Sequence, residues 1–180
     1  MGGFEVPRPR RGQQADRRVV GGLPVRVRSR RLGVSAAYFD GRPDQVSRIR
    51  GWCRNATRLG ADEAAPVVLA VSELVTNSIR HSASGGRWGR VKVTVETLPG
   101  DVVLVAVTDD GPRAGQGVSL PSMAPRVREL DTCGRGLHLV NELAEKWWWS
   151  GLPGGPLTVW ALIDPHRDLE RTHEDAPIGA

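Results

Sequence analysis

The period of the hydrophobic residues changes along this chain of 180 residues, and that change most constrains its fold. Within residues 44–82, apolar side chains recur at intervals of three and four, which is the spacing of amphipathic helices. Within residues 88–108 they alternate, with Val91, Val93 and Val95 on one face, as in half-buried strands. Helices followed by antiparallel strands predict an α+β fold with two layers.

The element order can be predicted in more detail from turn and cap residues. We expect a strand at 34–40, a helix at 44–59 capped by Asp44, a helix from about 62 or 66 to 82, a hairpin at 88–110, a helix at 134–147 and a terminal hairpin at 147–164. Pro66 suits the first turn of the second helix. The irregular stretch 111–134 is long for a simple connection, which favours a functional loop or lid.

The amino-terminal residues differ in composition from the rest. Residues 1–31 contain nine arginines, with Glu5 and Asp16 as the acidic residues, and lack apolar periodicity. We expect a disordered basic arm there, a folded domain at 32–164 and a polar tail at 165–180. Such an arm can be a solvated tail, or it can bind nucleic acid, anionic lipid or an acidic protein.

Other features limit the class of protein. The composition, 39% hydrophobic, is sufficient for one domain core, and no stretch has the apolar length of a membrane span or of a secretion signal. The chain is expected in the cytoplasm. Cys53 and Cys133 are too few for a disulfide framework, so both are expected as reduced thiols. Of the tryptophans in the terminal hairpin, strand alternation should bury some and expose at least one.

The second predicted helix has one polar side. Glu73, Asn77 and His81 follow one another at intervals of four residues, and Arg80 lies beside them. The simplest interpretation is that these side chains face water, as on most surface helices. Other segments have to decide whether they form a site.

Two further segments bear on this choice. "VTDDGP" places Asp109 and Gly111 where an apolar strand ends, although aspartate there can also simply form a turn. "CGRGLHLV" places Gly134 and Gly136 at the start of a helix, where free amides can hold a phosphate, but glycines also serve ordinary turns. The common P-loop, dinucleotide-binding, protein-kinase and hydrolase motifs are missing from the sequence.

The order of these three segments resembles the N, G1 and G2 boxes of the GHKL superfamily of histidine kinase-like ATPases. "AVSELVTNSIRHS", "GRGLHLV" and the closing "TVWA" are most similar to stand-alone bacterial anti-sigma-factor serine kinases. The resemblance covers about 36–163. It implies the Bergerat ATP-binding fold, a two-layer sandwich with a mixed, mainly antiparallel sheet.

The resemblance also implies roles for individual residues. Asn77 would coordinate Mg²⁺ on the phosphates of ATP, and Glu73 would be the general base. Asp109 would accept from the adenine amino group. The remaining implied nucleotide contacts are Arg80, His81, Gly111, Gly134, Arg135, Gly136, Leu137 and Thr158, and residues 112–133 would form the ATP lid.

Two positions depart from the family pattern. Arg113 stands where a glycine is usual at the first hinge of the lid, and His138 replaces a later glycine of the G2 box. We expect nucleotide binding to survive both changes. The two residues put the closure of the lid and catalytic turnover in question.

The resemblance implies a cytoplasmic, ATP-dependent serine/threonine kinase that acts on an anti-sigma-factor antagonist and can also silence a sigma factor. The alternative is a non-catalytic module that uses nucleotide as a conformational ligand to sequester a sigma factor or another regulator. Residues 1–40 contain neither histidine nor a helical pattern, so we do not expect a histidine kinase with a phosphoacceptor hairpin. Relatives often dimerise, which leaves a homodimer open.

Overall fold

A computed structural model describes residues 24–27, 29, 31–117, 120–122, 135–152 and 154–167. The strands are β1 (Val25–Val27), β2 (Val34–Asp40), β3 (Arg90–Thr97), β4 (Val103–Thr108), β5 (Lys146–Gly151) and β6 (Leu157–Ile163). They form one sheet in the order β1-β2-β3-β4-β6-β5. Each of its five strand pairs is antiparallel. The predicted α+β sandwich is confirmed, although no parallel pair occurs among the described strands.

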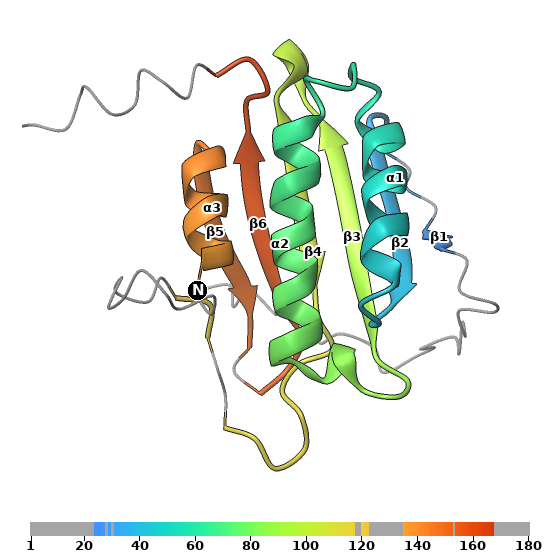
Figure 1. The fold of residues 1–180 in the computed structure, drawn as a ribbon, viewed down its shortest axis with the longest axis vertical. Helices are drawn as coiled ribbons and strands as arrows, with labels where there is room; N and C mark the ends of the chain where they lie inside the picture. Colours follow the sequence, from blue (N-terminus) through green and yellow to red (C-terminus); the bar gives the residue numbers. More distant parts are fainter. Residues whose placement is uncertain are drawn as a thin grey trace, which may run out of the picture.

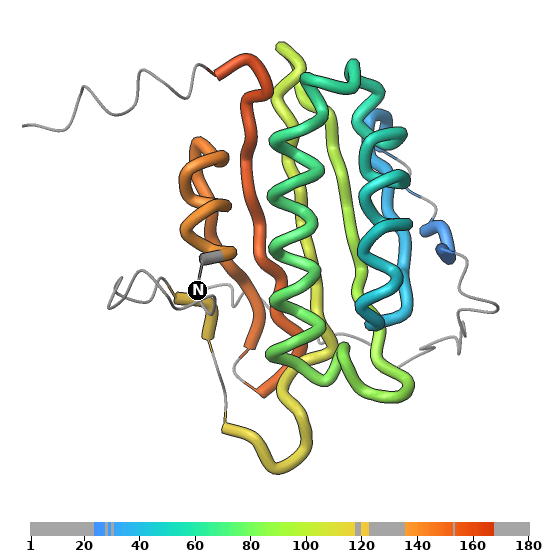
Figure 2. The backbone as a smooth tube through the Cα atoms, viewed as in Figure 1, coloured from blue at the N-terminus to red at the C-terminus, as the bar shows by residue number. Residues whose placement is uncertain are grey.

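The helices all lie on one face of this sheet, as Figure 1 shows. They are α1 (Gln45–Thr57), α2 (Ala65–His81) and α3 (Arg135–Leu143), with short 3₁₀ turns η1 (Ala83–Gly85) and η2 (Pro99–Asp101). In Figure 2 the chain can be followed down α2 and back up β3, then down β4. The carboxyl ends of α2 and β4 therefore lie at the same end of the molecule.

The core fills the space between the helices and the sheet. Alternation turns every second residue of β3 and β4 toward the helices. These residues are the fully or almost fully buried Val91, Val93, Val95, Val103, Val105 and Val107. The apolar side of α2 packs on them with Val67, Val71, Leu74 and Val75. Because that side faces the core, the opposite, polar side of α2 is held in a fixed direction.

Three local expectations need correction. Asp44 occupies the N-cap position of α1 but does not cap it, because Arg42 binds both of its carboxylate oxygens at 2.9 and 3.0 Å. Val25–Val27, within the expected disordered arm, pair with β2 as an edge strand. The third helix ends at Leu143, earlier than expected, because Glu145, just before β5, already donates its amide hydrogen to the carbonyl oxygen of Leu162 in β6.

The terminal hairpin follows the alternation expected from the sequence. Trp147 packs against the core, whereas Trp148 lies on the opposite face, 36% exposed, and stacks on Trp160 with ring centroids 6.1 Å apart. Within the described part of the chain, no helix has the length and apolarity needed to cross a bilayer.

Candidate nucleotide-binding site

The polar side of α2 faces the start of α3. A Cβ atom at Gly136 would lie 2.8 Å from Oε2 of Glu73 and 3.2 Å from Nδ2 of Asn77. A side chain at this position would therefore have to displace the Glu73 carboxylate and press on Asn77, both of them half-buried, whereas glycine lets the backbone of α3 lie beside them. The structure thus brings together Glu73, Asn77 and Gly136, three residues from two of the predicted segments.

The first turn of α3 adds hydrogen-bond donors to this place. The first amides of a helix have no partner within the helix, and they carry the positive end of its dipole. Gly136 and Leu137 stand in this turn, and both are half-buried. Gly134 lies outside the described residues, as does the side chain of Arg135. Arg80 and His81 are exposed in the last turn of α2.

The turn after β4 is organised by Asp109. Its Oδ1 accepts hydrogen bonds from the amides of Gly111, at 2.7 Å, and Leu157, at 3.0 Å. No described residue hydrogen-bonds its Oδ2, which leaves that oxygen as an acceptor for a ligand. Gly111 has a φ of +83°, and a Cβ there would lie 2.9 Å from the carbonyl of Gly155. The turn is therefore closed tightly against the loop that precedes β6.

Thr158 follows Leu157, the residue whose amide donates to Oδ1 of Asp109. The strand register places it opposite Thr108, and the two hydroxyl oxygens are 2.9 Å apart. Both alternate with core residues of their strands, so they lie on the sheet face that the helices do not cover. The helix side at this position is occupied by Leu157, which is 7% exposed. The role of Thr158 in adenine recognition stays a prediction.

Sequence reasoning missed Ser84, which connects three elements at this end of the sheet. Its hydroxyl donates to the carbonyl oxygen of Arg90, at 2.7 Å, and accepts from the amide of Asp110, at 2.9 Å. The Asp110 carboxylate in turn accepts from the amide of Arg90. Ser84 is completely buried in η1. No pattern in the sequence marks this serine, because its role depends on contacts between distant segments.

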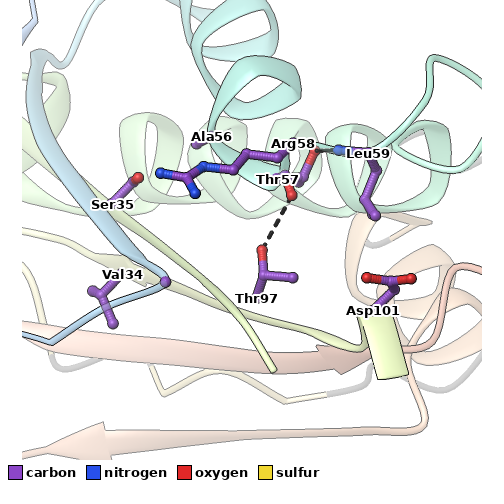
Figure 3. A pocket seen from close by; sticks show the side chains of 9 residues that line it. Val34, Ser35, Ala56, Thr57, Arg58, Leu59, Thr97 and Asp101 are labelled. Carbon is purple, nitrogen blue, oxygen red and sulfur yellow. Dashed lines mark hydrogen bonds between the residues drawn. The ribbon is translucent and has the colours of Figure 1, made fainter. Parts of the chain in front are cut away.

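A hollow elsewhere on the molecule does not coincide with these residues. It has a volume of ≈ 260 Å³ and lies between the carboxyl end of α1 and the start of β2, as Figure 3 shows. Arg58, Thr97 and Asp101 are among its lining residues. Thr97 pairs with Val103 at the start of β4, whereas Asp109 follows the end of that strand. The hollow is therefore at the opposite end of the sheet.

The donor set suits one hard cation with few protein ligands. The side-chain amide of Asn77 lies close to the backbone of Gly136, next to the Glu73 carboxylate. Within the described ranges, no group of three or more histidine, cysteine, aspartate or glutamate residues could hold a metal. Mg²⁺ commonly takes one or two protein ligands and completes its shell with water and substrate phosphates. These residues therefore fit a nucleotide-borne Mg²⁺ better than a metal held by the protein alone.

The comparison with family models decides the relationship. Residues 39–156 match the model of the histidine kinase-like ATPase domain, which is well over half of the chain. The chain belongs to the histidine kinase-like ATPase family. All three predicted boxes lie inside the matched residues. Family membership, with the geometry above, supports an ATP-binding domain with a regulatory role.

One solved structure is similar to this chain at low sequence identity. The histidine kinase domain of the blue-light activated histidine kinase from Erythrobacter litoralis EL346 is similar, with 21% identity and a TM-score of 0.41. The match covers 74% of this chain and 65% of that one, so the chain spans less than two thirds of the similar structure. No curated protein matches the sequence.

Proposed function

We propose that this histidine kinase-like ATPase is a serine/threonine protein kinase that acts on an anti-sigma-factor antagonist and can also hold a sigma factor. The observation that carries the proposal is the contact of Gly136 with Glu73 and Asn77. It joins a carboxylate, an amide oxygen and the free amides of a helix start in one place. Phosphoryl transfer needs this combination of charge stabilisation and positioning.

Each group has a role in this proposal. Oδ2 of Asp109 accepts from the adenine amino group, while Oδ1 stays bound to the protein backbone. Asn77 and the first amides of α3 bind the phosphate end. Mg²⁺ held at Asn77 would neutralise phosphate charge. The resemblance noted in the sequence supports Arg80, His81, Gly134 and Arg135 as further phosphate contacts.

Glu73 would act on the acceptor hydroxyl. Its carboxylate takes the hydroxyl proton as the serine or threonine oxygen bonds to the γ-phosphorus. The bond from that phosphorus to the bridging oxygen breaks, and ADP leaves with the electron pair. Glu73 is half-buried beside Asn77, and the two residues are one helical turn apart, so base and cation ligand face the same phosphate.

The test measures transfer and binding separately. Proteins retained by the chain in the presence of Mg-ATP are mapped for new phosphoserine and phosphothreonine. Glu73→Gln should abolish transfer while ADP still binds, and Glu145→Gln, an exposed residue after α3, should change neither. Unchanged transfer in the Glu73 variant would show that the base is assigned wrongly.

A non-catalytic module is the second candidate. The observation in its favour is Arg113, which stands at the first position after the Asp109 turn and is hydrogen-bonded to the end of α2. A lid fixed at its start suits a protein that changes partner affinity without turnover. Partner capture that depends on ATP, with no phosphate transferred or released by the wild type, would favour this candidate.

A further inference from the structure

Arg113 binds the carboxyl end of α2 with its guanidinium group. Nη2 donates to the carbonyl oxygens of Ile79, at 3.0 Å, and Arg80, at 2.9 Å, and Nε donates to that of Ser82, at 2.9 Å. The last carbonyls of a helix have no partner within it and carry the negative end of the dipole. A cation with a planar fork of donors is well suited to satisfy them.

The surrounding backbone is shaped for this contact. A Cβ atom at Gly85 would lie 2.1 Å from the carbonyl oxygen of Ile79 and 3.1 Å from Nη2 of Arg113. Any larger residue at this position would displace the turn that follows α2 from the helix end. Arg113 and Gly85, 28 positions apart in the sequence, thus both lie against the carboxyl end of α2.

A backbone hydrogen bond also joins the end of α2 to the segment that contains Arg113. The amide of Ala83 donates to the carbonyl oxygen of Gly111 at 2.7 Å. The turn that holds Asp109 is therefore attached to the end of α2 twice, once through backbone and once through Arg113. Asn77 lies in the last turns of that helix. The distance between the two predicted ends of the nucleotide site thus depends on these bonds.

We propose that Arg113 is a positioning residue, which holds the end of α2 and with it Asn77 at a fixed separation from Asp109. The proposal rests on the nucleotide site described above. ATP reaches both groups at once, whereas adenosine reaches only Asp109. When two parts of a site are already fixed in the free protein, a ligand that contacts both binds more tightly, because binding does not have to order them. Loss of Arg113 should therefore weaken ATP binding more than adenosine binding.

Three variants test this in the full chain. Arg113→Ala removes three hydrogen bonds, Arg113→Lys keeps the charge without the fork, and Arg54→Ala removes an exposed arginine of α1 as a matched control. Dissociation constants for Mg-ATP and adenosine are measured by competition with a fluorescent ATP analogue. Arg113→Ala should weaken ATP binding about tenfold and adenosine binding less than about twofold, since a lost charged hydrogen bond commonly costs about a factor of ten.

The lysine variant should lie between Arg113→Ala and the wild type, and Arg54→Ala should match the wild type. Amide hydrogen exchange at Ala83 and Gly85, measured without nucleotide, should accelerate most in Arg113→Ala and should not change in Arg54→Ala. Equal losses for ATP and adenosine, or no loss in either, would overturn the positioning role. If the wild type binds neither compound, the proposed function itself fails, while unaccelerated exchange would separately show that Arg113 does not hold the end of α2.

Discussion

Gly136 is the residue at which the two halves of the candidate site meet. Replacing a glycine within a helix by alanine usually stabilises a protein, by about 0.5–1 kcal/mol. At Gly136 the added methyl group would instead press on Glu73 and Asn77. In α1, a Cβ at Gly51 would meet no atom within 4 Å, so the same exchange has no such cost there.

We expect Gly51→Ala to raise the free energy of unfolding by up to about 1 kcal/mol and to leave nucleotide binding unchanged. Gly136→Ala should show no gain in stability and should weaken Mg-ATP binding by about tenfold or more, because it displaces Asn77, the proposed cation ligand, together with the proposed base Glu73. Urea unfolding and titration calorimetry measure the two effects. Identical behaviour of both variants would contradict the close approach of α3 to α2.

The buried thiol of Cys53 should make the stability of the protein depend on pH. Cys53 is completely buried on the inner side of α1, and this burial raises the pKa of its thiol to about 12. In the unfolded chain the thiol ionises near its ordinary pKa of about 8.5. The unfolded state then binds fewer protons than the native state, so stability should fall as pH rises between these values.

The expected loss from this group is at most about 1.4 kcal/mol per pH unit. Cys53→Ala should remove that part of the pH dependence, although the lost side chain also lowers stability at neutral pH. The measurement is urea unfolding of both proteins at several alkaline pH values. Parallel curves for the wild type and the variant would show that Cys53 is not held protonated in the native state.

At the scale of elements, a few polar groups connect the segments at the end of the sheet that lies near the carboxyl end of α2. Ser84 connects η1, the start of β3 and the turn after β4 through its two hydrogen bonds of 2.7 and 2.9 Å. Removal of its hydroxyl leaves the amide of Asp110 and the carbonyl of Arg90 without this partner. The arrangement of the Asp109 turn should therefore depend on Ser84.

Ser84→Ala should lower the free energy of unfolding by about 1–3 kcal/mol, the usual cost of unpaired buried polar groups. Ser47→Ala, at an exposed position in α1, is the control and should change stability by less than about 0.5 kcal/mol. Chemical denaturation gives both values. A loss no larger in Ser84→Ala than in the control would mean that the turn is held by other contacts.

The elements with a long, regular period were predictable from the sequence. The alternation of Val91, Val93 and Val95 indicated β3, and the spacing around Glu73 indicated α2 with one polar side. The edge strand Val25–Val27 was not predictable, because three residues in an arginine-rich segment become a strand only through pairing with β2. The interaction of Asp44 was not predictable either, because its carboxylate binds Arg42 instead of capping α1.

The candidate site was predictable to a similar extent. Glu73 and Asn77 lie beside Gly136, so residues of two of the three boxes are close together, while the roles assigned to them stay predictions. The side chain of Thr158 lies on the sheet face opposite to that of Leu157, because neighbouring residues of a strand point to opposite faces, so the sequence alone did not show which way its hydroxyl points. The contact between Arg113 and the end of α2 could not be foreseen either, because the sequence marked Arg113 only as an unusual residue.

At the scale of the whole molecule, the described helices form one layer on one sheet, and the candidate nucleotide site lies at α2, the start of α3 and the Asp109 turn. Titration calorimetry with Mg-ATP tests this claim most directly. The wild type should bind one nucleotide per chain, and Asn77→Ala should weaken Mg-ATP binding while leaving adenosine binding nearly unchanged, because the amide faces the phosphate end. No heat of binding in the wild type, with the fold intact by circular dichroism, would contradict the account.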